Sequence, residues 1–370
     1  MTTPNLPATQ VTESVETQWG IPLQPAGCPN CKQVFLIGSS AMGIPCPDCG
    51  KGKLAPQPAL LRPEPPELLI PFQKKPADLL PALTGFVKEV WLRPDDFNPN
   101  TLMHRMVPVY WPMWLVDSDV NGNWQAEAGF DYQVESAQES YSSSGWHSRD
   151  VIETRVRWEP RVGLIDRHYD NISSPATSDY QRKLNLVGNY QLEKSIPYQH
   201  DLVGQAALKA PDLQPESAWP LAQSTLNRLA GEDCRKACDG QHFRNFIVHA
   251  SYDSLHWTQL LMPLFSTFYT DDDGNPHPVL INGQTGRIGG VRLASQKKGW
   301  QRAGISLAVA VGILLLALLC FALSVLLPPL SVVGILLAVA AFGVGIYAIV
   351  PAVWPWQWNR GQQVQKVITH

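Results

Sequence analysis

Four of the seven cysteines in this sequence are spaced as metal ligands. They form two CxxC pairs, Cys28-Pro-Asn-Cys31 and Cys46-Pro-Asp-Cys49, with fourteen residues between the pairs. Each CxxC turn directs two thiolates at one point, so two turns can supply the tetrahedral four-sulfur shell of a structural zinc ion. Gly50 follows the last cysteine and permits the backbone to reverse there. The spacing therefore predicts one zinc ion, bound by Cys28, Cys31, Cys46 and Cys49.

The same cysteines have two alternative interpretations, which are a pair of disulfides and a thioredoxin-like redox site. A redox CxxC occurs once, where a strand leads into a helix, whereas this sequence has two CxxC pairs in a segment rich in proline and glycine. The disulfide alternative stays open at this point. Because thiolates must stay reduced to bind metal, the zinc interpretation also predicts a cytosolic location for this end of the chain.

A second metal site is a weaker candidate. Cys234, Cys238 and His242 recur every four residues, so one face of a helix could present all three. Asp239-Gly240 predicts that the helix ends before His242, and no fourth ligand is evident. We therefore expect two ordinary helical cysteines at positions 234 and 238.

Two short loops resemble ligand-binding motifs without completing them. The sequence Asp271-Asp272-Asp273-Gly274 lacks the alternating ligands and terminal glutamate of an EF-hand, so it predicts an acidic hairpin turn. The sequence Gly283-Gln-Thr-Gly286-Arg287 lacks the Gly-Lys-Ser/Thr ending of a phosphate loop and predicts a turn between strands. No Ser/His/Asp set or carboxylate pair is defined by its spacing. The sequence thus predicts no catalytic residue and a protein that is not an enzyme.

A long apolar segment excludes a wholly soluble protein. Only 16% of the 370 residues are charged, and residues 303–359 contain no Asp, Glu, Lys, Arg or His. Pro328-Pro329 divides this run into two stretches of 24 residues, 304–327 and 330–353, each longer than the ~20 residues that span a bilayer. Adjacent prolines cannot continue a helix, so the run predicts a transmembrane helical hairpin.

The residues that flank the apolar run predict its orientation. Lys297, Lys298 and Arg302 precede it, Arg360 and Lys366 follow it, and tryptophans border both ends. By the positive-inside rule both ends face the cytoplasm, in agreement with the reduced zinc site. The remaining charge is acidic, since residues 61–302 carry a net −5, which argues against a nucleic-acid partner.

Hydrophobic periodicity predicts a mixed α+β middle domain. Helices are expected over 79–91 and 213–238, and strands over 68–72, 106–134, 151–157 and 245–250. Asn121-Gly122-Asn123 predicts a hairpin turn, and the serine-rich stretch 138–148 predicts a loop. A weak echo between Pro112–Asn123 and Pro263–Asn275 has two interpretations, which are a duplicated hairpin in one sheet and a coincidence of common turn chemistry.

These observations give a fold class of α+β with an N-terminal zinc ribbon, antiparallel hairpins in the middle and a C-terminal two-helix transmembrane hairpin. The expected organisation is a disordered lead at 1–23, the zinc ribbon at 24–54, a proline-rich linker at 55–67, an acidic cytosolic α+β domain at 68–298, the transmembrane hairpin at 303–355 and a cytosolic tail at 356–370.

The order of these motifs resembles a known family. The paired CPxC knuckles are followed by Leu69-Ile70-Pro71-Phe72, Trp91-Leu92-Arg93-Pro94, residues 109–115, Met262-Pro263-Leu264 and residues 279–287, and then by the apolar segment. Together, over about residues 25–355, they resemble the bacterial TFIIB-type zinc-ribbon membrane proteins, which are often mislabelled as replication-restart helicases. A helicase P-loop is absent from this sequence. The resemblance implies a multi-pass protein of the bacterial inner membrane, similar to components encoded beside flotillin-like (SPFH-domain) scaffolds and linked to envelope stress.

The leading hypothesis is a non-enzymatic membrane adaptor or scaffold, with the zinc ribbon as a docking element on a flexible spacer and the middle domain as a platform for a protein partner. One alternative is a membrane-tethered ribbon that binds nucleic acid through Lys32, Lys51 and Lys53. Another is an enzyme with an unrecognised site in 68–298.

Overall fold

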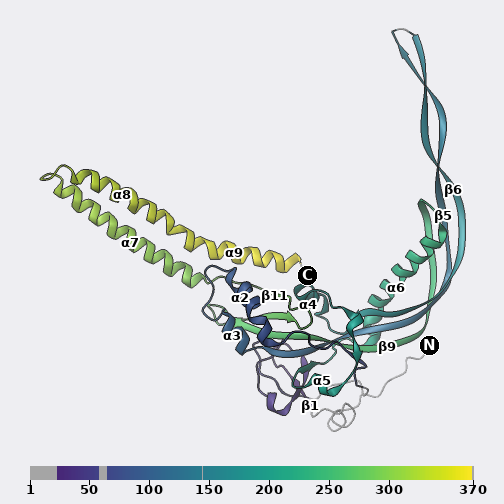
Figure 1. Ribbon diagram of the computed structural model, residues 1–370, viewed down its shortest axis with the longest axis horizontal. Coiled ribbons are helices and arrows are strands. Elements are labelled where there is room, and N and C mark those ends of the chain that lie inside the picture. The colour runs from purple at the N-terminus through teal and green to yellow at the C-terminus, as the bar shows by residue number, and fades with distance from the viewer. Residues whose placement is uncertain (1–22, 58–64, 144, 369–370) are drawn as a thin grey trace. The chain divides into compact units, whose positions relative to one another are not determined.

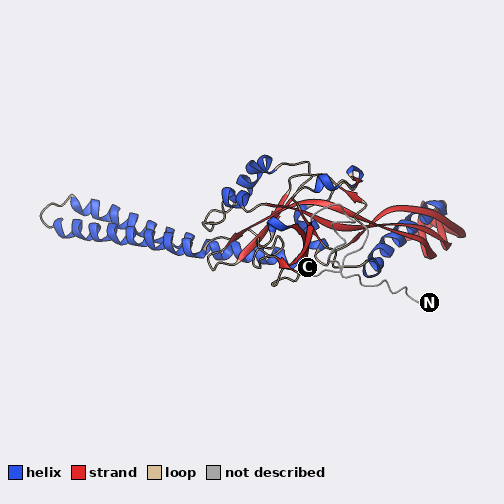
Figure 2. Ribbon diagram, turned by 90° about the horizontal axis from the view of Figure 1, so that it is seen from below, coloured by secondary structure: helices blue, strands red, loops and turns tan. Residues whose placement is uncertain are grey.

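The computed structural model describes residues 23–57, 65–143 and 145–368, which form two compact units (Figure 1). Unit 1 comprises Met1–Pro112, Thr177–Asp212 and Leu260–His370, and unit 2 comprises Met113–Ala176 and Leu213–Gln259. The predicted lead at 1–23, except Leu23, and positions 58–64 of the predicted linker lie outside the described residues. The structure is mixed α+β with a large sheet, as predicted (Figure 2).

The large sheet runs in the strand order β11-β10-β9-β5-β8-β2-β1-β3, and β4, β6 and β7 attach to this path. Its strands are β1 (Leu23–Gly27), β2 (Val34–Gly38), β3 (Ala55–Pro56), β4 (Leu68–Leu69), β5 (Val107–Ser142), β6 (Gly145–Pro175), β7 (Ile196–Pro197), β8 (Ala207–Lys209), β9 (His242–Thr270), β10 (Pro276–Asn282) and β11 (Ile288–Gly290).

The helices include the two predicted in the middle of the chain. They are η1 (Ser39–Ala41), η2 (Pro76–Leu79), α2 (Leu80–Lys88), α3 (Pro99–His104), α4 (Tyr180–Val187), η3 (Leu192–Lys194), α5 (His200–Val203), α6 (Pro215–Cys238), α7 (Gln296–Leu323), α8 (Leu330–Tyr347) and α9 (Ile349–Ile368). The apolar face of η2 and α2 is buried against β9 and β10, with Leu83 and Val87 in one core with Phe265 and Val279.

The cysteine-rich segment belongs to the sheet of unit 1. Strand β2 pairs antiparallel with β8, with Phe35 opposite Lys209, and β8 pairs parallel with β5. The core around the cysteines accordingly includes Val109 and Ala207 as well as Phe35 and Ile37. The segment is therefore packed into a larger unit, unlike the docking element on a flexible spacer that the sequence suggested. Local composition suggested the spacer, whereas the β2–β8 pairing joins Phe35 to Lys209, which is 174 positions away in the sequence.

Two C-terminal helical segments, Gln296–Leu323 and Leu330–Gln362, are long and apolar enough to cross a membrane. α7 packs against α8, and the buried positions of both helices in this region are small residues seven apart, which are Ala310 and Ala317 on α7 and Gly334 and Ala341 on α8. Small side chains let two helix backbones approach closely. A Cβ atom on Gly334 would lie 3.1 Å from the ring of Phe321. Pro328 and Pro329 lie in the connection between the two helices.

In unit 2, α6 packs on a sheet formed by β6, β5 and β9. Its buried stripe repeats every fourth residue and consists of Ala218, Ala222, Leu226, Ala230, Cys234 and Cys238. Ala218 packs with Trp114 and Ala176, and the other residues of the stripe share a core with Val120, Trp124 and Ile165 of the sheet. Both cysteines therefore serve as small core residues of the helix, as expected.

The predicted turn at Asn121-Gly122-Asn123 is wrong, because these residues lie inside the continuous strand β5. Gly122 is needed there for a different reason. A Cβ atom at this position would lie 2.1 Å from the carbonyl oxygen of His249, so the glycine permits the close approach of β9. A glycine required by a tertiary contact has the same local sequence as one required by a turn.

The predicted loop at 138–148 is also wrong. β5 and β6 stay paired as far as Ser142 opposite Gly145, so the serine-rich stretch forms the end of a long hairpin. Pairing between the two strands satisfies the backbone N–H and C=O groups of these residues whatever their side chains are. Amino-acid composition therefore does not predict this pairing.

Of the two interpretations of the echo between Pro112–Asn123 and Pro263–Asn275, the duplicated hairpin is wrong, because the first of its two turns does not form. Its second half does form a hairpin, in which β9 turns at Asp271–Asn275 into β10 and Gly274 adopts a φ of +78°. The first half forms one uninterrupted strand.

Candidate metal centre

The first CxxC turn connects β1 to β2. Cys28 donates its backbone N–H to the carbonyl of Gln33 at 2.9 Å, and Lys32 donates to the carbonyl of Cys28 at 2.9 Å. Lys32 has a φ of +62°, in the left-handed region that glycine usually occupies. This tight turn brings the Cys28 and Cys31 side chains to the same side.

The second CxxC turn repeats this geometry. Cys46 donates to the carbonyl of Gly52 at 2.7 Å, and Gly50 donates to the carbonyl of Cys46 at 2.8 Å. Gly50, which holds the position equivalent to Lys32, has a φ of +67°. A Cβ atom on Gly52 would lie 2.5 Å from the Cys28 sulfur, so this glycine leaves room for the first turn.

The two turns bring all four sulfur atoms together. The sulfurs of Cys28, Cys31, Cys46 and Cys49 lie within 4.8 Å of one another, and Cys28–Cys49 and Cys31–Cys46 are each 3.6 Å apart. A disulfide needs about 2.0 Å, whereas a tetrahedral metal ion with metal–sulfur bonds of about 2.3 Å places its sulfurs roughly 3.8 Å apart. The four cysteines are free, and their cluster fits a metal ion such as zinc.

Without a cation the thiols of Cys28, Cys31 and Cys46 have unequal pKa values. The hydrogen bond with Cys46 lowers the pKa of Cys31 to about 5, and the same contact together with burial raises the pKa of Cys46. Burial also raises the pKa of Cys28. One thiolate is thus stabilised by its protonated neighbours, and a metal ion would displace the remaining protons when it binds.

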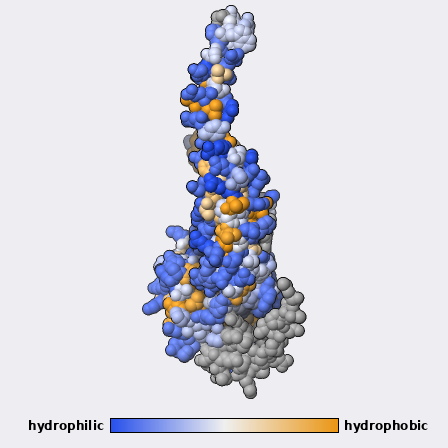
Figure 3. Space-filling model, turned by 90° about the vertical axis from the view of Figure 1, so that its right-hand side faces the viewer, coloured by the Kyte–Doolittle hydropathy of each residue, from blue (hydrophilic) through white to orange (hydrophobic). Residues whose placement is uncertain are grey.

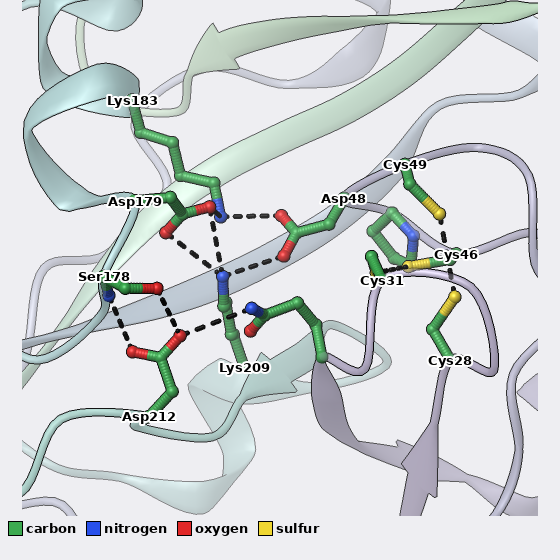
Figure 4. Close-up of polar contacts among 12 residues, drawn as sticks. Cys28, Cys31, Cys46, Asp48, Cys49, Ser178, Asp179, Lys183, Lys209 and Asp212 are labelled. Carbon is green, nitrogen blue, oxygen red and sulfur yellow. Dashed lines mark hydrogen bonds and ion pairs between the residues drawn. The ribbon is translucent and has the colours of Figure 1, made fainter. Parts of the chain in front are cut away.

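The second turn also enters a buried cluster of charges, the charge quartet, which consists of Asp48, Asp179, Lys183 and Lys209 (Figure 4). The Asp48 carboxylate lies 2.6 Å from Lys183 Nζ and 2.8 Å from Lys209 Nζ. The Asp179 carboxylate contacts the same ammonium groups at 2.9 and 3.2 Å. The lysine side chains are only 3% and 1% exposed. Each charge therefore has two opposite partners within the quartet, which is neutral, and Arg182 lies a further 3.7 Å from Asp179.

Burial and pairing compete in the pKa values of the quartet. Burial raises the pKa of Asp48, but the charges on Lys183 and Lys209 lower it by more, so it lies below its ordinary value. Burial lowers the pKa of Lys183, an effect that both carboxylates oppose. For Lys209 the two carboxylates outweigh burial and raise the pKa. Because each ammonium contacts two carboxylates, we treat both lysines as charged at neutral pH.

The first turn is anchored to the same part of unit 1 as the second. Gln33, two residues after Cys31, donates its side-chain amide to Asp212 at 3.3 Å. Asp212 in turn accepts hydrogen bonds from the backbone N–H and the hydroxyl of Ser178, at 2.7 and 2.9 Å. Residues 178–183 at the start of α4 therefore hold both cysteine turns (Figure 4).

The remaining sequence candidates take structural positions. His242 lies in β9 and contacts Asp131 at 2.8 Å, and Cys28, Cys31, Cys46 and Cys49 form the one potential metal cluster among the described residues. Asp271 accepts the backbone N–H groups of Asp273 and Asn275, as expected of an acidic turn. Residues 283–287 connect β10 to β11, as predicted.

Sequence reasoning found the four cysteines and missed the quartet. An acidic residue inside a CxxC turn, Asp48, was the available signal, but its partners are 135 and 161 residues away. No family model, curated protein or solved structure matches the chain.

Proposed function

We propose that this chain is a non-enzymatic membrane adaptor, in which a zinc-braced unit 1 carries the membrane anchor and unit 2 presents a docking arm to a protein partner. The main support for the proposal is an exposed two-stranded extension of unit 2, the β-arm, which consists of residues 132–142 of β5 and 145–155 of β6. β9 begins at His242, which contacts Asp131, so the arm continues as two strands alone. None of its described residues is buried.

The end of the β-arm carries a pair of exposed aromatic residues. Tyr141 and Trp146 face each other across the strands, with ring centroids 5.4 Å apart, and are 70% and 72% exposed. Polar residues predominate over the rest of the arm's surface, the narrow upper part in Figure 3. Two-stranded ribbons are only marginally stable in water, and tyrosine and tryptophan are the residues most enriched in binding hot spots. Both points support a protein partner at the tip, and the family resemblance makes a flotillin-like (SPFH) scaffold the candidate.

Removal of the tip aromatics should abolish partner binding. Full-length chain purified from membranes is expected to retain a stable partner. The amount of partner that co-purifies should be at least ten-fold lower for Tyr141→Ser/Trp146→Ser. The matched control is Val162→Ser/Leu164→Ser, two exposed apolar residues on β6 outside the arm. Partner loss in the control but not in the tip variant would contradict the proposal, as would the absence of any partner from the wild-type preparation.

The proposed anchor is a two-span hairpin in the bacterial inner membrane, with both ends in the cytoplasm. Two arguments support this orientation independently. Zinc thiolates need a reducing compartment, and Lys297, Lys298, Arg302 and Arg360 flank the apolar run while the 324–329 connection carries no charge.

Cysteine labelling tests this orientation in intact cells. In a Cys320→Ser background, Gln362→Cys should react with a membrane-impermeant maleimide only after the cytoplasm is opened. Ser331→Cys, next to the connection between α7 and α8, should react from outside or not at all. Labelling of position 362 in unopened cells would rule out the hairpin, and the background without an added cysteine supplies the baseline.

A further inference from the structure

Trp91 lies just beyond α2 in the sequence, yet it packs against the base of the apolar helices. Its ring lies 5.5 Å from Trp354 of α9 in an edge-to-face arrangement, and the Arg302 guanidinium of α7 lies 5.8 Å from its centroid. The next residue, Leu92, accepts the backbone N–H of Ser295, the N-cap of α7, at 2.6 Å. Trp91 is therefore fixed relative to the point where α7 begins, and it is 40% exposed.

These contacts place Trp91 beside the two ends of the apolar run. Arg302 is the last charged residue before the uncharged run 303–359, and Trp354 is near the end of that run. Both therefore mark the boundary between apolar and polar surface, where tryptophan and arginine side chains sit in membrane proteins. Because Trp91 contacts both, it lies at that same boundary although it comes from the folded part of unit 1.

The surroundings of Trp91 carry an excess of positive charge. Glu89 is paired with Arg292, and Asp95 with Lys298. The Asp272 carboxylate accepts the backbone N–H of Lys297 at 3.0 Å. Among the residues that the structure describes, the side-chain cations of Arg93, Lys297 and Arg302 form no ion pair. The Arg302 cation lies beside the exposed indole, and Arg93 and Lys297 are two and five residues from Trp91 and Arg302 in the sequence. Cations and an indole at this boundary match the phosphate-bearing headgroup of a lipid, which is an anion next to apolar chains.

We propose that Trp91 and the cations Arg93, Lys297 and Arg302 form a binding site for the headgroup of an anionic phospholipid, so that α2 and its C-terminal connection rest on the membrane surface. This inference rests on the proposed membrane anchor. It assigns a second membrane contact to unit 1 in addition to the apolar helices themselves.

Depth-dependent quenching tests the membrane contact. Full-length chain in a Cys320→Ser background carries a bimane label at Trp91→Cys and is reconstituted in phosphatidylcholine and phosphatidylglycerol vesicles that contain a lipid with a nitroxide headgroup. Quenching at position 91 should be at least twice that of a label at Leu202→Cys. Leu202 is a matched control because it is 43% exposed and lies in α5, beside β1 rather than the apolar helices (Figure 1).

A third label separates this inference from the anchor itself. Leu315→Cys, in the middle of α7, should be quenched by a nitroxide on the lipid acyl chain. If position 315 is quenched and position 91 is no more quenched than position 202, the headgroup site is refuted while the anchor stands. If position 315 is not quenched either, both proposals fall.

The charge preference has its own measurement. In detergent, added phosphatidylglycerol should raise the unfolding temperature of the full chain more than phosphatidylcholine does, and inorganic phosphate should give no rise. The triple variant Arg93→Gln/Lys297→Gln/Arg302→Gln should lose at least half of the phosphatidylglycerol shift. Arg228→Gln/Arg235→Gln/Lys236→Gln, three exposed cations of α6, should keep it. Equal losses in both variants, or an equal rise with inorganic phosphate, would overturn the lipid site.

Discussion

Replacement of Cys49 by serine is expected to remove the metal ion and to unfold the segment around it. The four sulfurs lie close enough to share one ion, and that ion would join the two cysteine turns whose side chains form one core with Phe35 and Ile37 of β2. Binding free energy in such sites is folding free energy, of apparent size about 10 to 16 kcal/mol in small zinc domains. Metal content should fall from about one zinc per chain to less than half, and limited proteolysis should cut the segment 23–57 first.

The chain contains a matched control for this substitution. Cys234 is buried in α6, far in sequence from the cluster, and Cys234→Ser should leave the metal content unchanged. A wild-type chain that holds iron, or that holds less than half an equivalent of zinc, would contradict the zinc assignment. A Cys49→Ser chain that retains full zinc would contradict the ligand set.

Replacement of Lys209 by methionine should have the second-largest effect, because it leaves the charge quartet with an uncompensated negative charge. Lys183 would then be the only buried cation left beside the two carboxylates, since Arg182, which lies 3.7 Å from Asp179, is half-exposed. Removal of one partner from a buried ion pair costs about 3 to 5 kcal/mol. Since Asp48 is part of the second cysteine turn, we also expect faster transfer of zinc to a chelator.

Two further variants separate the charge effect from a general loss of packing. Lys209→Met/Asp179→Asn restores neutrality and should be more stable than Lys209→Met alone. Arg228→Met removes a cation from an exposed ion pair with Glu232 and should cost less than about 0.5 kcal/mol. The measurement is the unfolding free energy of the purified full chain, followed by pulse proteolysis. If Lys209→Met is as stable as Arg228→Met, the quartet does not stabilise unit 1.

The features that the sequence predicted well are those that local chemistry determines. Two CxxC turns at this spacing have few interpretations other than a metal site, and the structure brings Cys28, Cys31, Cys46 and Cys49 together. The apolar run needs only its composition and length to predict two long apolar helices. The amphipathic pattern of α6 likewise depends on nearby residues alone.

The features that the sequence did not predict depend on contacts between distant residues. Gly122 in an Asn-Gly-Asn sequence has the local signature of a turn, and the approach of His249 makes it a strand residue instead. Nothing in the local sequence distinguishes Lys183 and Lys209 from exposed lysines. Only the fold places them against Asp48. Trp91 reads as the end of an amphipathic helix until Arg302 and Trp354 are placed beside it.

The separation of these contacts along the chain implies an order of events during synthesis. The four metal ligands lie within a stretch in which Cys28 and Cys49 are 21 residues apart, so the loop they close is short and the metal can bind once that stretch has left the ribosome. Asp48 must wait for Lys183 and Lys209, which are translated 135 and 161 residues later. Through this interval the aspartate stays hydrated on a metal-stabilised turn, and its burial is postponed until both lysines are made. A nascent chain stalled before residue 183 should therefore hold its zinc ion although β8 and β9, which complete the surrounding sheet, are not yet made.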